Sequence, residues 1–338
     1  MRVALISLAA AVAASPMGNN LTLLESRSVD SNLMNDFKFY AQHAAAAYCN
    51  SEGPLPGSFV TCGGGECNDV MRNRVTIIRT LQGSGTGIAG YVSVDKTRQE
   101  VVFSARGSHN VRNFITDLSF TQRDCNFAPG CKVHSGFADS WDEISAAATS
   151  AITEGLRANP SYKLVITGHS LGGAVATLAG AYLRRSGFRP AIYTFGTPRV
   201  GNDVFANFSN RQRGGLFRIT HIDDPVPRLP PMIFSYRHSG TEYWLSNGDA
   251  SQTEYRPADV KVCRGIDTVA CNAGTVGFNL PAHLFYLGGI SDCTPRAIEW
   301  RRDANPSDRE LEARLTKWSQ QDQELVNGCY YCYTTVNV

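Results

Sequence analysis

A strand, turn and helix pattern in the middle of the chain constrains the fold more than any other feature. The apolar run KLVIT at 163–167 leads into GHSLG at 168–172, and an Ala/Leu-rich helix is predicted from there to about Arg185. Continuous apolar runs are typical of strands buried on both faces of a parallel sheet. Further apolar runs at 191–195 and 216–220 predict two more strands. Strand, helix and strand in this order form a right-handed βαβ unit, so we expect an α/β fold with a largely parallel sheet.

Other segments fit the same class. Short β-type runs separated by turns predict strands at Val75–Leu81, Ala89–Val94 and Glu100–Ser104. Alanine-rich or amphipathic segments predict helices at Asp36–Tyr48 and Ser140–Leu156. We therefore expect the α/β domain to cover residues 36–300, preceded by a flexible or pro-segment at 15–35 and followed by a helical extension at 301–338.

Composition and charge exclude several classes of protein. Hydrophobic residues make up 43% and charged residues 18% of the 338, which is globular composition and excludes disorder along the whole chain. The net charge of +2 gives no electrostatic basis for binding nucleic acid. After residue 15 no apolar run approaches the roughly 18 residues needed to span a bilayer. We therefore expect no nucleic acid partner and no integral membrane segment.

The first fourteen residues predict export from the cell. MRVALISLAAAVAA has one Arg, an apolar stretch and then small residues, which is typical of a secretory signal peptide cleaved near Ala14. An N-terminal membrane anchor is less favoured because the stretch is short. The chain also has ten Cys, and several lie close together in the sequence, which favours small disulfide loops in a secreted protein. A zinc site is less favoured, since only Cys329 and Cys332 form a CxxC pair and no His lies beside it.

The sequence GHSLG has the G-x-S-x-G pattern of a nucleophile elbow. In that structure the serine lies on a tight, strained turn between a strand and a helix, and the glycines leave room for the neighbouring backbone. We therefore predict Ser170 as a nucleophile. The backbone N–H of Leu171, at the start of the helix, is then one donor to an oxyanion. The alternative is a tight turn with no chemistry, but the apolar strand before the motif and the helix after it favour the elbow.

A serine hydroxyl needs a base and an acid to become nucleophilic, and in this architecture they follow in the order Ser, acid, His. Three aspartates at strand ends are candidate acids: Asp203, Asp223 and Asp224. The residues alone barely separate Asp223 from Asp224. Two histidines follow them, His238 in a polar stretch and His283 before an apolar run, and we favour His283 as the base. His169 and His221 lie beside the predicted site and are expected to be structural.

Six motifs in order resemble the filamentous-fungal lipases, the class 3 or Rhizomucor-like family. They are VVFSARGSHN at 101–110, VITGHSLGGAVATLAG at 165–180, FGTPRVGN at 195–202, THIDDPVPRLPP at 220–231, EYW at 242–244 and NLPAHLFYL at 279–287. The resemblance spans about residues 36–293. It implies a secreted α/β-hydrolase with a central, mostly parallel sheet, helices on both faces and a short helical lid.

The resemblance also assigns roles to individual residues. It implies Ser170 as nucleophile, His283 as base and Asp224 as acid, because the family's acid precedes one residue and then Val-Pro. The Arg-Gly-Ser triplet implies Ser108 as the second oxyanion donor. The lid is expected at about 109–118, with an apolar face of four residues, although Phe114 stands where many relatives have tryptophan. The lid residues are Val111, Phe114, Ile115 and Leu118.

Disulfides of the family imply the pairs Cys49–Cys293, Cys62–Cys67 and Cys125–Cys131. Cys263–Cys271 resembles an extra pair of a subgroup, the secreted lipases of Fusarium-type plant pathogens. Apolar residues next to the predicted site are candidates for the acyl groove, and ordinary core packing is the alternative for each one. They are Pro198, Val226, Leu229, Leu280 and Phe285.

The predicted activity is hydrolysis of acylglycerol esters at a lipid–water interface. We predict a triacylglycerol lipase that acts through an acyl-enzyme on Ser170, as a monomer with no metal or organic cofactor. The same fold can also host a mono- and diacylglycerol lipase, a phospholipase A1 or a feruloyl esterase. The apolar lid residues argue mildly against the last of these. Peptide hydrolysis and a non-enzymatic binding protein are less favoured.

The last 38 residues lie beyond the resemblance. Arg301-Arg302 is a dibasic pair of the kind that secretory proteases cleave, or simply a solvated charge pair. Ser307 with Glu310 predicts a capping box. A helical stripe follows, with Gly328 as the predicted stop, and its residues are Leu311, Leu315, Trp318 and Leu325. We expect this helix to pack near the active-site face and to restrain activity until it is trimmed.

Overall fold

The computed structural model describes residues 29–291, 293 and 306–334, with side chains as far as Gly328. The predicted signal peptide, most of the segment 15–35 and the dibasic pair Arg301-Arg302 lie outside the described residues. So do the side chains of Cys329 and Cys332. None of the described helices is both long enough and apolar enough to cross a membrane.

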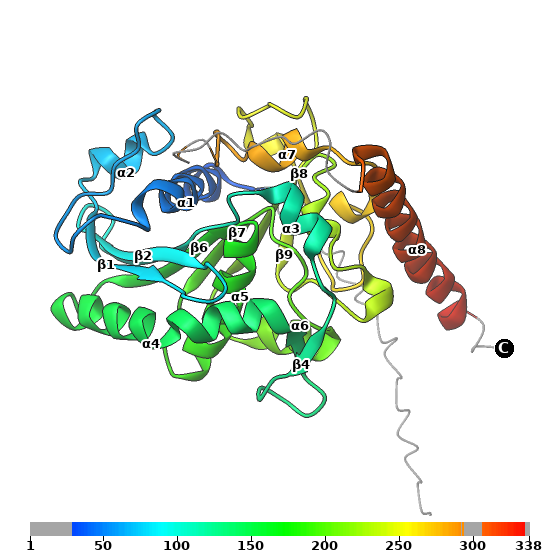
Figure 1. The fold of residues 1–338 in the computed structure, drawn as a ribbon, viewed down its shortest axis with the longest axis horizontal. Helices are drawn as coiled ribbons and strands as arrows, with labels where there is room; N and C mark the ends of the chain where they lie inside the picture. The colour runs from blue at the N-terminus through cyan, green and yellow to red at the C-terminus, as the bar shows by residue number, and fades with distance from the viewer. Residues whose placement is uncertain (1–28, 292, 294–305, 335–338) are drawn as a thin grey trace, which may run out of the picture.

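An eight-stranded sheet in the order β1-β2-β3-β6-β7-β8-β9-β10 forms the centre of the molecule (Figure 1). The five strands from β3 to β9 are parallel, while the pairs β1–β2, β2–β3 and β9–β10 at the two edges are antiparallel. The predicted strands are all present, and the α/β-hydrolase fold is confirmed. The strands are β1 Thr76–Gln82, β2 Ala89–Asp95, β3 Glu100–Ala105, β6 Lys163–His169, β7 Ala191–Phe195, β8 Leu216–His221, β9 Thr241–Leu245 and β10 Val260–Cys263.

Helices cover both faces of this sheet and create two apolar cores. Helix α1 (Ser31–Asn50) packs on one face, and α4 (Ser135–Ala158) and α5 (Leu171–Arg185) pack on the other (Figure 1). On the first face Phe37 and Tyr193 meet edge to face, and on the second Phe103 contacts Trp141. Because the parallel strands are buried on both sides, their sequences read as continuous apolar runs.

Two of these helices begin earlier than predicted. Helix α1 begins at Ser31 rather than Asp36, because the side chain of Asp30 accepts a hydrogen bond from Leu33 N at 2.8 Å and caps the first turn. Met34 is buried in the core, so residues 29–35 belong to the body and not to a flexible segment. Helix α4 begins at Ser135, where the ring of His134 caps it by accepting from Phe137 N at 3.3 Å.

Shorter elements connect these layers. Strands β4 and β5 form a separate hairpin, and four 3-10 turns lie in the loops between β8 and α7. The shorter elements are α2 Asn68–Arg72, α3 Val111–Asp117, β4 Gln122–Asp124, β5 Lys132–His134, α6 Asp203–Arg211, η1 Val226–Arg228, η2 Met232–Phe234, η3 Pro257–Asp259, η4 Asn272–Gly274 and α7 Leu280–Leu284.

The described residues contain four disulfides, and they are the pairs that the resemblance implies: Cys49–Cys293, Cys62–Cys67, Cys125–Cys131 and Cys263–Cys271.

The C-terminal helix α8 (Asp308–Thr334) lies at one end of the molecule and contacts η2 and η4 (Figure 1). The predicted capping box is present, with Ser307 N donating to Glu310 Oε2 at 2.8 Å. Two details of the prediction are wrong. Leu325 is exposed rather than part of the buried stripe. Gly328 does not end the helix, because it keeps a helical conformation instead of the left-handed one that a glycine stop requires.

Candidate active site

Ser170 lies on the turn between β6 and α5, at the carboxyl end of the central strand. Its backbone has φ 57° and ψ −128°, a conformation that non-glycine residues rarely adopt and that is typical of strained functional turns. A Cβ at Gly172 would come within 2.7 Å of the backbone of Ala105 and Arg106, so no larger residue fits there. The glycine thus lets α5 approach β3 closely enough to raise Ser170 above the sheet edge.

Asp224 and His283 form the second part of the site. Asp224 follows β8, and its Oδ2 accepts a hydrogen bond from His283 Nδ1 at 2.8 Å. Both side chains are fully buried. Asp223 is turned elsewhere and accepts from Asn279 Nδ2 at 2.7 Å. Of the two aspartates, between which the residues alone left the choice open, Asp224 is the one that contacts His283.

Two buried polar atoms of the predicted triad are unpaired among the described residues. Ser170 Oγ and His283 Nε2 are both buried, and neither has a hydrogen-bond partner among the described residues. All other polar atoms of the two triad partners are bonded, since Asp224 Oδ1 also accepts from Val226 N at 2.9 Å. In the absence of substrate the bond between nucleophile and base is often long, and it tightens only in the reacting complex.

The other candidates from the sequence lie outside this constellation. His238 is buried and donates from Nε2 to the Pro227 carbonyl at 2.7 Å. Asp203 lies in the first turn of α6. His169 and His221 brace the site as expected. His169 Nε2 donates to the His283 carbonyl at 2.9 Å. His221 Nδ1 donates to the Ala282 carbonyl at 2.8 Å.

His169 is held neutral. Burial lowers its pKa well below the ordinary value for histidine, and the ring of His283 adds to this effect. Because Nε2 carries the proton given to the His283 carbonyl, Nδ1 accepts a hydrogen bond from Tyr48 at 2.7 Å. Tyr48 and His169 thus hold the backbone of His283, the predicted base.

Tyr286 is a site residue that the sequence analysis missed. Its hydroxyl donates to Asp224 Oδ2 at 2.5 Å, the same oxygen that His283 contacts. Burial and the adjacent carboxylate raise the pKa of Tyr286 well above its usual value, so the phenol keeps its proton. The one feature of the sequence that could have indicated this contact is the position of Tyr286, three residues after His283.

Two predicted oxyanion donors border the serine. Leu171 is the first residue of α5, where backbone N–H groups have no carbonyl a turn earlier to bond. The loop with Ser108 comes close on the other side, since a Cβ at Gly107 would lie 3.1 Å from Ser170 Cβ. Arg106 fixes this loop by donating to Glu52 at 2.7 Å and to the Gly87 carbonyl at 2.9 Å.

An apolar cluster lies above the site. The predicted lid contains α3. Val111 and Ile115 of this helix are buried, while Phe114 and Leu118, the residue just after the helix, are half-buried. Three of the predicted acyl-groove residues, Val226, Leu229 and Leu280, belong to the same cluster. Pro198 is buried beyond β7, while Phe285 is half-buried outside this cluster.

A cleft of about 510 Å3 opens beside the predicted oxyanion donors. It runs between α3 and the start of α4, and its walls include Ser108, Leu171, Phe114, Leu118, His134 and Phe137. Sequence analysis did not predict the α4 side of this cleft, because α4 was expected to begin only at Ser140. Most of the surface that lines this cleft is apolar, and both predicted oxyanion donors belong to the lining.

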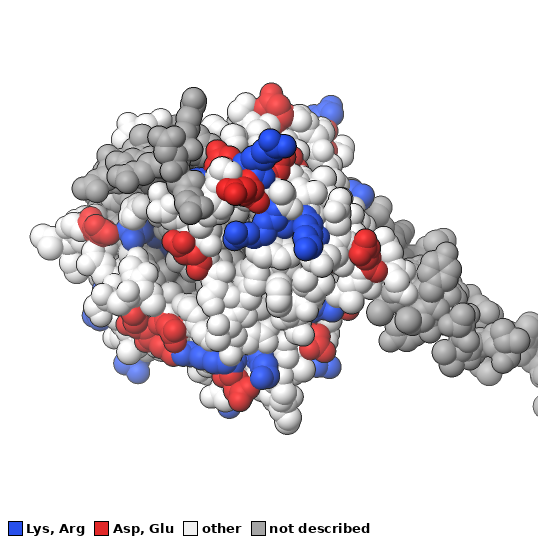
Figure 2. Space-filling view, turned by 45° about the vertical axis from the view of Figure 1, so that its right-hand side comes forward, with Lys and Arg blue, Asp and Glu red and all other residues white. Residues whose placement is uncertain are grey.

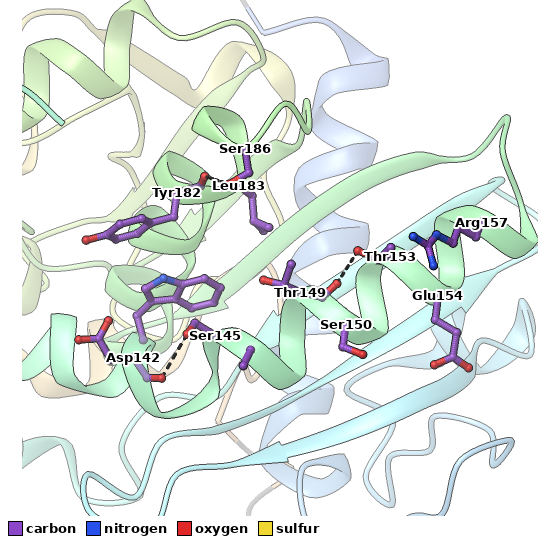
Figure 3. Close-up of a pocket in the computed structure, with 12 residues that line it drawn as sticks. Asp142, Ser145, Thr149, Ser150, Thr153, Glu154, Arg157, Tyr182, Leu183 and Ser186 are labelled. Carbon is purple, nitrogen blue, oxygen red and sulfur yellow. Dashed lines mark hydrogen bonds between the residues drawn. The ribbon is translucent and has the colours of Figure 1, made fainter. Parts of the chain in front are cut away.

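Two other features carry no catalytic group. A groove of about 760 Å3 between α4 and α5 is lined mainly by polar side chains, among them Ser145, Thr149 and Arg157, and none of the triad residues borders it (Figure 3). Among the described residues, Cys49, Cys62 and Cys293 have sulfur atoms close enough to hold a metal ion. All three are in disulfides, so they are not free thiolates.

Comparisons with known proteins identify the family of this chain. Residues 102–234 match the family Lipase (class 3). The chain is 47% identical over 327 residues to secreted mono- and diacylglycerol lipase 1 of Fusarium solani, covering 95% of this chain and 97% of that protein. The chain belongs to the class 3 lipase family.

Structures of other class 3 lipases agree with the fold. A Penicillium cyclopium MDLA structure matches with a TM-score of 0.74 at 34% identity, over 79% of this chain and all of that one. The mono- and diacylglycerol lipase of Aspergillus oryzae matches with a TM-score of 0.73 at 34% identity, over 77% and 98% of the two chains. A lipase of Rhizomucor miehei is 32% identical over 269 residues, which are 78% of this chain and 70% of that protein. About a fifth of this class 3 lipase therefore has no counterpart in the Penicillium structure.

Proposed function

We propose that this class 3 lipase hydrolyses acylglycerol esters by acyl transfer from Ser170 to water. His283 Nε2 takes the proton of Ser170 as its oxygen attacks the ester carbonyl. Asp224 holds the His283 ring with the proton on Nδ1 and stabilises the imidazolium that forms. The imidazolium then protonates the leaving glycerol oxygen, and water, activated by the same base, releases the fatty acid. The Asp224–His283 bond, with Asp223 turned away, is the observation that carries this proposal.

The negative charge of the tetrahedral intermediate needs donors already in place. The backbone N–H of Leu171 and that of Ser108, with its hydroxyl, are suited to this role because both residues border the cleft next to Ser170. Losing one such donor typically costs about 10²–10³ in rate. The chemistry needs no metal or organic cofactor, since proton transfer and charge stabilisation are both supplied by the chain.

The cleft and the apolar cluster together suggest where acyl chains lie. We propose that the scissile chain occupies the cleft between α3 and α4, with Phe114, Leu118 and Phe137 along it. The cluster around Val226, Leu229 and Leu280 would become available when α3 moves. Each CH₂ group of the acyl chain that becomes buried stabilises binding by about 0.8 kcal/mol, so long-chain esters should be favoured over short ones.

Relatives narrow the substrate class. The Fusarium solani and Penicillium relatives are named secreted mono- and diacylglycerol lipases, which favours partial glycerides over the triacylglycerol predicted from the sequence. We propose accordingly that the protein is secreted and prefers mono- and diacylglycerols. The Rhizopus and Rhizomucor relatives are named only lipases, which keeps triacylglycerol hydrolysis as the second candidate.

A panel of four substrates tests this proposal: a long-chain triacylglycerol, the matching diacylglycerol, a phospholipid and methyl ferulate. We expect the diacylglycerol to be cleaved fastest and methyl ferulate slowest. A triacylglycerol rate equal to or above the diacylglycerol rate would favour the second candidate. Cleavage of the phospholipid or of methyl ferulate alone would contradict the assignment to acylglycerols.

We further propose that the protein acts as a monomer at a lipid surface. Its face near α8 carries charged residues in small groups of mixed sign with uncharged surface between them (Figure 2). Residues of the same chain cover the apolar face of α3, so burial of this face needs no second subunit. Activity on a poorly soluble ester should rise steeply at its solubility limit, where a lipid surface first replaces this cover. A smooth hyperbolic curve through that limit would contradict a closed lid.

A further inference from the structure

Helix α8 contacts α3. Leu311 and Leu315 of α8 are buried in the same cluster as Val111 and Ile115 of α3. Next to them the ring of Trp318 meets Phe120 edge to face at 5.2 Å, just beyond the end of α3. Apolar side chains of α3 and of the C-terminal helix are therefore buried together in one cluster.

A charged contact joins the same two helices. Arg112 of α3 donates from Nε to Asp308 Oδ1 at 2.9 Å and from Nη2 to the Pro306 carbonyl at 2.5 Å. The Arg112 side chain is only 4% exposed, while that of Asp308 is 51% exposed. A nearly buried guanidinium needs such acceptors, since leaving it unpaired is costly. Movement of α3 away from α8 breaks both bonds.

The middle of α8 is attached to the body of the protein instead. Asp322 is buried, and its Oδ2 accepts from Arg199 Nη1 at 2.8 Å while its Oδ1 accepts from Met232 N at 2.7 Å. Ser319 Oγ accepts from Arg228 Nη1 at 3.0 Å. These bonds anchor α8 to the loop that follows Asp224 and to Arg199, which lies between β7 and α6. One end of α8 therefore contacts the lid, and a later turn is fixed beside the catalytic acid.

We propose that α8 is a built-in restraint on lid opening: its anchored part at Ser319 and Asp322 positions Leu311, Leu315 and Asp308 to hold α3 over the active site. The proposal rests on the proposed function, because it concerns access to Ser170. The lid opens only when α3 gives up these contacts, and a lipid surface replaces the apolar ones but not the bonds of Arg112. The helix therefore raises the amount of lipid surface that the enzyme needs before it becomes active.

The test weakens the contact with the lid without touching the catalytic groups. Asp308→Asn in the full chain keeps the side-chain size and removes the charge that Arg112 faces. Glu312→Gln is the matched control, because Glu312 is an exposed acid on the same helix with no ion pair among the described residues. Hydrolysis of p-nitrophenyl butyrate is measured below its solubility limit, where no interface is present, and on an emulsified diacylglycerol.

With Asp308→Asn, the rate on the soluble ester should rise roughly threefold to tenfold, the range expected for losing a half-exposed, charge-assisted hydrogen bond. The rate on the emulsion should change much less, because the lid is already open there. Glu312→Gln should leave both rates at the level of the unmodified chain. Leu315→Ala is the second variant, and it should raise the rate on the soluble ester in the same way.

Two results would overturn the inference. If Asp308→Asn and Leu315→Ala lower the melting temperature but leave the ratio of the two rates unchanged, α8 only braces the fold. If Glu312→Gln raises the rate on the soluble ester as much as Asp308→Asn does, the effect comes from net charge and not from the contact with Arg112. Absence of any ester hydrolysis by the unmodified chain would instead contradict the proposed function.

Discussion

Two regions of the molecule are stabilised by different kinds of contact: the layer around Asp224 and His283, and the cover formed by α3 and α8. Around Asp224 and His283, short directional hydrogen bonds from Tyr286, Val226 and His169 fix nearly every polar atom. Between α3 and α8 the contacts are mainly apolar, with Arg112 as the polar link. Apolar contacts are non-directional and exchange readily for lipid, so we expect the cover to move while the geometry around Asp224 and His283 stays fixed.

The largest effect should come from the nucleophile itself. Ser170→Ala should reduce ester hydrolysis by about 10⁴-fold or more, as in serine hydrolases that lose this residue. The substitution removes one buried hydroxyl without a partner, so the melting temperature should not fall. Rates on a soluble ester together with a thermal melt check both points. Substantial residual activity in a folded variant would remove Ser170 from the mechanism.

The two neighbouring aspartates should differ sharply. Asp224→Asn should cost about 10⁴ in kcat, because an amide at this position no longer favours the productive His283 tautomer. Asp223→Asn should cost less than about tenfold, since the side chain of Asp223 bonds only Asn279 among the described residues. Steady-state kinetics on one soluble ester compares the two variants. Equal losses would contradict the assignment of the acid.

Tyr286→Phe tests whether the bonding around the acid matters to the rate. The variant leaves Asp224 Oδ2 with His283 as its side-chain partner. We expect kcat to fall about threefold to thirtyfold, the cost of losing one hydrogen bond to a charged group, with KM unchanged. A residue with only a packing role would lower the melting temperature without changing kcat. A change in KM alone would place Tyr286 in substrate binding instead.

Acid should destabilise the folded chain through its buried neutral histidines. Burial lowers the pKa of His134 to about 4 and that of His43 to about 3, so both stay neutral in the folded chain. The unfolded chain takes up their protons below about pH 6.5, so stability is lost as pH falls from there toward the folded pKa values. From pH 7 to 5.5 we expect a loss of about 1 kcal/mol per buried histidine. Chemical denaturation at both pH values measures it, and equal stability would contradict neutral buried histidines.

The catalytic half of the molecule is largely predictable from sequence because its signals are local. The elbow needs glycines at fixed positions around Ser170, and the parallel strands need unbroken apolar runs, so both are visible without a structure. The start of α1 was missed because a single capping contact of Asp30 decides it. Strands β9 and β10 were missed because their polar residues, such as Glu242 paired with Arg218, are buried by partners far away in the sequence.

The cover was only partly predictable, since what buries it is non-local. The apolar spacing of Leu311, Leu315 and Trp318 indicates an amphipathic helix, but not its partner on α3. The prediction that the stripe continues to Leu325 is wrong, because the buried face becomes polar at Ser319 and Asp322, where it meets Arg228 and Arg199. Nothing in the spacing distinguishes an aspartate that is solvated from one that is buried against an arginine.

Hydrogen exchange of the full chain, with and without micelles of a non-hydrolysable ether lipid, tests the central difference between the two layers most directly. We expect amides of α3, Val111–Asp117, to exchange faster when micelles are present. We expect those of β8 and η1, at 216–228, to keep their protection. Unchanged exchange in α3, or equal loss of protection in both regions, would contradict a fixed catalytic layer under a cover that lipid can displace.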